Sequence, residues 1–215
     1  DLSLILLFYY ISKFAKADKF LESVEYAIND AGYYLTSRTE KTADAYCQTV
    51  QEDLQEQGYR ITENVIADEH LFPLRGFKGR EYFYIAKEET LDGETLMRYL
   101  NAAVYDCMIV NLRRKGNGVV TYLCDTADES AVALSKDIAL HGRKDALKFA
   151  VAIVELSSDR VYCLGNKPSK HQQMIANYVM NCDLPLKEPY IGKEKLPFQR
   201  ELENSMQHFD TKSIF

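Results

Sequence analysis

The sequence of 215 residues lacks the motifs that hold nucleotide phosphates. It contains no GxxxxGK[ST] loop, and no GxGxxG follows an expected strand. The stretch Gly116-Asn117-Gly118 lies between an expected helix and an expected strand. This order is the reverse of the one that directs a helix N-terminus at a phosphate group. These absences exclude P-loop enzymes and Rossmann-type dinucleotide-binding enzymes.

Residue spacings that suit metal binding or nucleophilic catalysis are also missing. No two of the four histidines have the i, i+4 spacing that lets two imidazoles bind one metal, and no GxSxG is present. The strand acid Glu155 also lacks the acid-x-Lys triplet of metal-dependent nucleases, because Leu156 and Ser157 follow it. We therefore expect no metal and no cofactor, and the sequence assigns no catalytic residue.

The cysteines and the charge balance indicate a soluble protein of a reducing compartment. Five cysteines lie far apart among apolar residues and form no CxxC pair, which favours reduced thiols over a disulfide framework. The cytoplasm or another reducing compartment is therefore expected. The net charge of −6 argues against general binding of polyanions, although a local basic patch remains possible.

An apolar stretch opens the chain, from Leu2 to Ile11. About ten helical residues span about 15 Å, which is half of a bilayer core, so we expect no membrane span within this chain. The inner end of a longer anchor is the alternative. We favour a helix that is covered by protein, and its expected partner-binding residues are Leu4, Leu7, Phe8 and Ile11.

Three regions follow from the patterning. Residues 1–58 form an N-terminal helical segment that ends at Gly58, residues 59–182 an α+β core, and residues 183–215 a proline-punctuated C-terminal tail with a short helix. In the core, strand patterns predict one pair within 59–87, a single strand at 119–124 and a second pair within 147–164.

Helices are predicted between these strands. One runs from Gly93 to Lys115 behind the capping residue Asp92, the next ends at Gly142, and a third opens near Asn166. Because the order lacks a regular β-α alternation, we predict an α+β fold. It consists of an N-terminal helical arm or helix pair, then a small mostly antiparallel sheet (two strand pairs plus one strand) packed by three helices.

A basic and aromatic stretch from Leu74 to Tyr84 is the strongest binding motif. It mixes cations with aromatic residues, the combination that contacts phosphates and stacks bases, but it matches only part of the RNA-recognition octamer. A solvated hairpin turn with aromatic residues packed beneath it is the competing interpretation. Together with a second basic cluster, the candidate nucleic-acid-binding residues are Arg75, Phe77, Lys78, Arg80, Arg113, Arg114 and Lys115.

The functional hypothesis is a non-enzymatic interaction or scaffold subunit. It would bind a protein partner, or a second copy of itself as a homo-oligomer, through the apolar N-terminal helix. A nucleic-acid-associated protein that uses the basic hairpin is the first alternative. The second is an enzyme whose site assembles from distant residues, such as His141 or His171 with a carboxylate.

Overall fold

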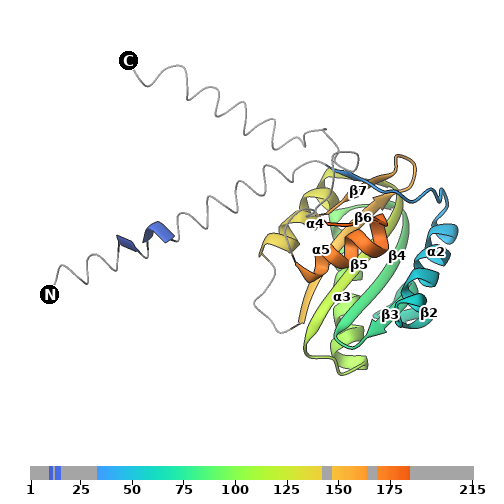
Figure 1. Ribbon diagram of the computed structural model, residues 1–215, viewed down its shortest axis with the longest axis horizontal. Helices are drawn as coiled ribbons and strands as arrows, with labels where there is room; N and C mark the ends of the chain where they lie inside the picture. Colours follow the sequence, from blue (N-terminus) through green and yellow to red (C-terminus); the bar gives the residue numbers. More distant parts are fainter. Residues whose placement is uncertain (1–9, 12, 16–32, 142–146, 164–168, 185–215) are drawn as a thin grey trace, which may run out of the picture. The chain divides into compact units, whose positions relative to one another are not determined.

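The computed structural model describes residues 10–11, 13–15, 33–141, 147–163 and 169–184 (Figure 1). The sheet and the helices that follow Tyr33 belong to one compact unit, Tyr33–Lys193, whereas the described helical residues 10–11 and 13–15 belong to another unit. In chain order the elements are β1 (Tyr34–Leu35), α2 (Ala43–Glu56), β2 (Arg60–Ala67), β3 (His70–Lys78), β4 (Glu81–Leu91), α3 (Gly93–Tyr105), η1 (Asp106–Val110), β5 (Gly116–Ala127), α4 (Glu129–His141), β6 (Leu147–Glu155), β7 (Arg160–Tyr162), α5 (Lys170–Met174) and η2 (Ile175–Met180). The segments η1 and η2 are π-helical.

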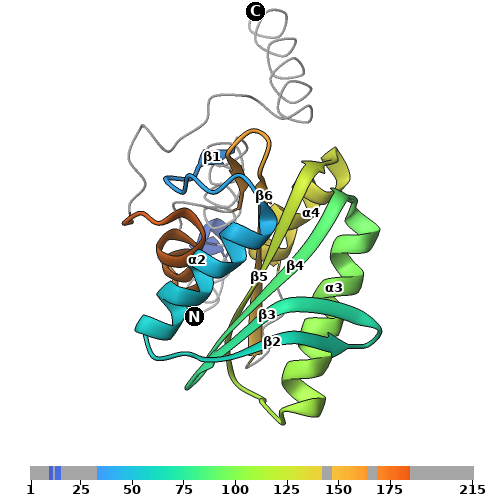
Figure 2. The same cartoon turned by 90° about the vertical axis from the view of Figure 1, so that its right-hand side faces the viewer.

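Within these described ranges, seven strands form a single mixed sheet in the order β1-β7-β6-β5-β4-β3-β2. The central strands β4, β5 and β6 are parallel, and the other pairs are antiparallel. Helix α3 connects β4 to β5, and α4 connects β5 to β6. These two helices contact each other on one face of the sheet, while α2 and α5 lie on the other face (Figure 2).

The predicted sheet architecture is wrong, although the α+β class holds. The expected strand pairs do not form a small, mostly antiparallel sheet with one extra strand, because β4 and β6 both pair in parallel with β5. Parallel neighbours require a long crossover connection, which α3 and α4 supply. The first part of the expected helical segment 1–58 lies largely outside the described residues, and within the segment Tyr34 and Leu35 form strand β1.

The core lies on both faces of β4, whose residues Tyr82–Ala86 are all buried. Phe83 packs toward η2, where its ring lies 6.1 Å from that of Tyr178. Tyr84 projects to the opposite face, and its ring lies 5.2 Å from that of Phe72. Burial on both faces is typical of the centre of an α/β sheet covered by two helical layers.

Capping residues in the sequence correctly predicted where some helices begin or end. The Asp92 carboxylate accepts a hydrogen bond from the Thr95 amide at 2.7 Å at the start of α3, which confirms the predicted cap. Gly58 follows α2 with φ +81°, as a helix-ending glycine should. The predicted helix Gly93–Lys115, in contrast, is α-helical only as far as Tyr105 and continues as the π-helix η1.

The sheet is irregular at its β2 edge. Asn64 has φ +50° in the middle of β2, and the pairing with β3 passes from Glu63 and Leu74 directly to Val65 and Phe72. The residue of β3 at the interruption is Pro73, which has no amide hydrogen to donate. The edge strand therefore contains a distortion at its centre.

Candidate functional site

A buried ion pair fixes η1 against the sheet. The Asp106 carboxylate accepts hydrogen bonds from Arg75 Nη1 at 3.0 Å to each oxygen and from the Tyr84 hydroxyl at 2.9 Å. Arg75 also donates to Thr62 Oγ1 at 3.3 Å. Burial and the nearby Asp106 charge raise the pKa of Tyr84, which keeps its hydroxyl a proton donor. These contacts tie the first residue of η1 to β3 and β4.

The chain on either side of Asp106 exposes large apolar side chains. Backbone hydrogen bonds close the end of η1, from Asn111 N to Asp106 O and from Arg113 N to Cys107 O, both at 2.9 Å. The residue between them, Leu112, has φ +53° and is 74% exposed. We call the following residues the exposed apolar segment: Tyr105, Met108, Ile109, Val110 and Leu112.

Cations lie near this segment at one end of the sheet. Asn117 N donates to Arg80 O at 2.8 Å, and the Tyr82 hydroxyl donates to Lys115 O at 2.8 Å. The two contacts hold the β3–β4 turn beside the start of β5, and both views place these parts near the end of η1 (Figures 1 and 2). We call the exposed cations of this region the basic end: Lys78, Arg80, Arg113, Arg114 and Lys115.

The structure brings the predicted nucleic-acid-binding residues to this region, but two of them are engaged inside the fold. Arg75 pairs with Asp106, so its charge is compensated. Phe77 is only partly exposed, and the guanidinium groups of Arg75 and Arg113 lie 5.0 and 5.8 Å from its ring centre. Its ring also packs edge-on against Tyr82 at 5.3 Å. This ring does not form an open platform on which a base could stack.

The predicted partner-binding residues lie mostly beyond the described chain. Leu4, Leu7 and Phe8 are outside the described residues. Ile11 is within them, and its side chain is 55% exposed. The predicted N-terminal contact surface therefore stays a prediction.

Sequence reasoning missed the exposed apolar segment. The helix predicted over Gly93–Lys115 has an apolar stripe that includes Cys107 and is flanked by Met108, and no contact surface was predicted at Ile109, Val110 or Leu112. A signal was present, because apolar residues from Cys107 to Val110 leave no polar face, and three cations follow Leu112 directly. A helix that loses its polar face at one end indicates a change of structure or a contact surface.

The backbone at Leu112 supplies a first test. Its left-handed conformation disfavours a side chain, so Leu112→Gly is expected to raise the free energy of unfolding by about 1 kcal/mol. Urea denaturation would measure the gain. Leu112→Ala keeps a Cβ atom and should give no comparable gain, and equal stability of the two variants would contradict this account.

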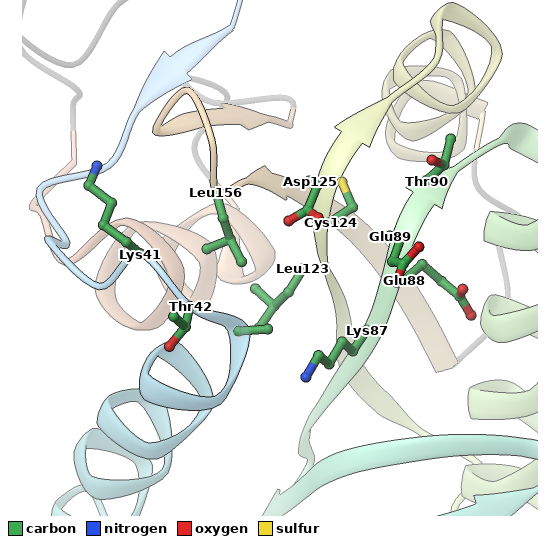
Figure 3. Close-up of a pocket in the computed structure, with 11 residues that line it drawn as sticks. Lys41, Thr42, Lys87, Glu88, Glu89, Thr90, Leu123, Cys124, Asp125 and Leu156 are labelled. Atoms are coloured by element: carbon green, nitrogen blue, oxygen red, sulfur yellow. The ribbon is translucent and has the colours of Figure 1, made fainter.

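A second candidate site is a pocket of about 700 Å³ at the carboxyl ends of β4 and β5. Figure 3 shows Lys87 extending toward the space beside α2, whereas Glu88 points to the other side. Lys87 pairs with Asp44 at 2.9 Å, and Lys41, also in the pocket lining, pairs with Asp159 at 2.5 Å. The two lysines of the pocket are therefore compensated by carboxylates.

The thiol and imidazole groups near these elements offer little reactivity. Burial raises the pKa of the Cys124 thiol in the pocket to about 12, so the thiol is protonated at neutral pH. His171 Nε2 lies 3.0 Å from Lys148 O, and burial lowers the pKa of this imidazole. The side chain of His141 lies outside the described residues. Within the described part of the chain, no three His, Cys, Asp or Glu residues gather as a metal site.

Comparison of the chain with protein families, with curated proteins and with solved structures found no match. None of the helices in the described ranges is both long enough and apolar enough to cross a membrane.

Proposed function

We propose that this protein is a non-enzymatic interaction protein that binds a negatively charged partner through its basic end. The observation that carries the proposal is the junction of five exposed cations with the exposed apolar segment. A large exposed apolar patch beside polar residues is typical of an interaction surface.

Charge distribution supports an anionic partner. The chain has a net charge of −6, yet Arg113, Arg114 and Lys115 are consecutive, and Arg80 lies beside them. Among the described residues, the side chains of Arg80, Arg114 and Lys115 have no ion-pair partner. A local cluster of one sign directs association even when the net charge has the opposite sign.

The pocket at the other end of the sheet supports an enzyme less well. Its lysines are paired with carboxylates and its thiol is protonated, so it offers no prepared nucleophile. The N-terminal residues Leu4, Leu7, Phe8 and Ile11 remain proposed as a separate contact surface for a protein partner or a second copy.

Removing three cations tests the proposed function. The variant Arg113→Ala/Arg114→Ala/Lys115→Ala should bind a sulfated polysaccharide about tenfold more weakly at low salt, because each exposed cation contributes on the order of 0.5 kcal/mol. Titration calorimetry over a series of salt concentrations would measure the change.

The matched control removes the same charge elsewhere. Lys41→Ala/Lys87→Ala/Arg98→Ala replaces three cations that form ion pairs away from the basic end. It should bind the polysaccharide as tightly as the unaltered protein. Equal losses in both triple variants would show that net charge, and not the basic end, determines binding, and would contradict the proposal.

A further inference from the structure

We infer that the anionic partner is a lipid surface: the exposed apolar segment inserts into a negatively charged membrane while the basic end contacts the headgroups. This inference rests on the proposed function and specifies its partner. The observation behind it is a short stretch of chain in which exposed apolar residues are followed directly by cations. The apolar residues are Met108, Ile109, Val110 and Leu112, and the cations are Arg113, Arg114 and Lys115.

The segment suits the boundary between headgroups and acyl chains. Four of its five side chains carry no charge or hydroxyl, and Tyr105 joins an apolar ring to a hydroxyl. A short amphipathic element of this kind buries its apolar groups about 5–10 Å into the membrane interface. Lysine and arginine beside it add attraction to anionic lipids, which falls off within a Debye length.

The segment is held in shape before it meets a partner. Asp106 anchors its first turn through Arg75 and Tyr84, and the hydrogen bonds of Asn111 and Arg113 close its end. Leu112 is kept exposed in a backbone conformation that disfavours its side chain. A preformed surface binds without a large loss of conformational entropy, and strain held in one place often marks a functional site.

Two other kinds of partner fit the exposed apolar segment and the basic end less well. Single-stranded nucleic acid would use exposed aromatic rings, but the exposed residues are mainly aliphatic, and guanidinium groups lie over the ring of Phe77. A second copy paired about this segment would bring two sets of Arg113, Arg114 and Lys115 together, and like charges oppose such contact. An anionic lipid surface satisfies the apolar and the cationic groups at once.

The charge of the whole molecule favours one orientation of the protein on the membrane. Because the net charge is −6, an anionic leaflet repels the protein as a whole. In the described part of the chain, five exposed cations gather at the basic end, which an anionic leaflet attracts, and the exposed apolar segment is adjacent to it. The protein should therefore bind with the β3–β4 turn and the start of β5 toward the membrane.

Cosedimentation of the full chain with vesicles tests this inference. We expect binding to phosphatidylcholine vesicles that contain phosphatidylserine, and much weaker binding to phosphatidylcholine alone. Ile109→Ser/Leu112→Ser should weaken binding about a hundredfold, because each inserted aliphatic side chain contributes about tenfold. The cation triple variant should also lose about a hundredfold, since each cation near an anionic leaflet contributes about fivefold.

The control replaces apolar residues that are equally exposed elsewhere. Ile66 and Leu71 are exposed neighbours on the β2–β3 hairpin. Ile66→Ser/Leu71→Ser should bind vesicles as the unaltered protein does. Circular dichroism and thermal melting would verify that all variants are folded.

The outcomes separate the inference from the proposed function. Lack of vesicle binding, or unchanged binding of Ile109→Ser/Leu112→Ser, overturns the lipid inference. If that variant still binds a single-stranded oligonucleotide or the polysaccharide as the unaltered protein does, the proposed function stands with another partner. If the cation triple variant also keeps its polyanion affinity, the proposed function fails. A lipid-free dimer that Ile109→Ser/Leu112→Ser abolishes would identify a second copy as the occupant and overturn the lipid inference.

Discussion

Asp106→Ala is expected to lower the free energy of unfolding by about 3–5 kcal/mol, because it leaves the Arg75 charge buried without its partner. The side chain of Arg75 is only 16% exposed, so water compensates little of the loss. The Tyr84 hydroxyl loses its acceptor at the same time. Urea denaturation would measure the effect.

Removing both charges is the matched comparison. In Arg75→Met/Asp106→Leu no charge remains unpaired, so this double variant should be destabilised much less than Asp106→Ala. A loss below about 1 kcal/mol in Asp106→Ala would mean that the pair does not hold η1 against the sheet.

Gly116→Ala is expected to cost about 2–5 kcal/mol. Gly116 has φ +144°, and a Cβ atom there would lie 2.4 Å from Arg80 O and 2.5 Å from the ring of Tyr82. The carbonyl oxygen belongs to the β3–β4 turn, so relief requires a shift of backbone. The start of β5 and Arg80 would move apart, and the basic end would be less compact. Thermal melting with a van't Hoff analysis would measure the loss.

Gly79→Ala separates the cost of the backbone conformation from the cost of the close contact made by the added Cβ atom. Gly79 also has a positive φ, +57°, but no atom lies within 4 Å of an added Cβ. This variant should lose only about 1 kcal/mol, from the backbone conformation alone. If Gly79→Ala and Gly116→Ala are equally destabilised, the close approach of Arg80 to β5 has no energetic importance.

Local structure was predictable because its causes are local. The Asp92 cap and the helix-ending Gly58 depend on a few neighbouring residues, and both are present. The turn between β6 and β7 was predictable for the same reason, since a polar triplet, Ser157–Asp159, separates two strand patterns.

Strand order was not predictable in this way, because it depends on pairings between distant residues. The run Tyr82–Ala86 is apolar on both faces, which is a parallel-sheet signal. The irregular order of elements around it pointed instead to separate strand pairs. Only the register of β4 with β5, such as Tyr84 opposite Val120, distinguishes the two arrangements.

The candidate site was half predictable. The basic residues of the Leu74–Tyr84 stretch were selected from their mixture with aromatic residues and Arg113–Lys115 as a separate basic cluster, and the structure brings both groups to one end of the sheet. The apolar residues were missed because a regular helical period was extended through Asp106. Hydrogen bonds in a π-helix span five residues instead of four, so the following side chains are rotated away from the earlier stripe, and sequence periodicity does not reveal where this begins.

The distortion at Asn64 has a consequence for solubility at high concentration. A straight outer strand presents a row of unsatisfied amide and carbonyl groups, which is a template for fibril growth. In β2 the left-handed residue interrupts that row, and at the opposite margin β1 has only two residues. Stacking of copies edge to edge is thereby discouraged, so this protein should resist amyloid formation even where it is crowded.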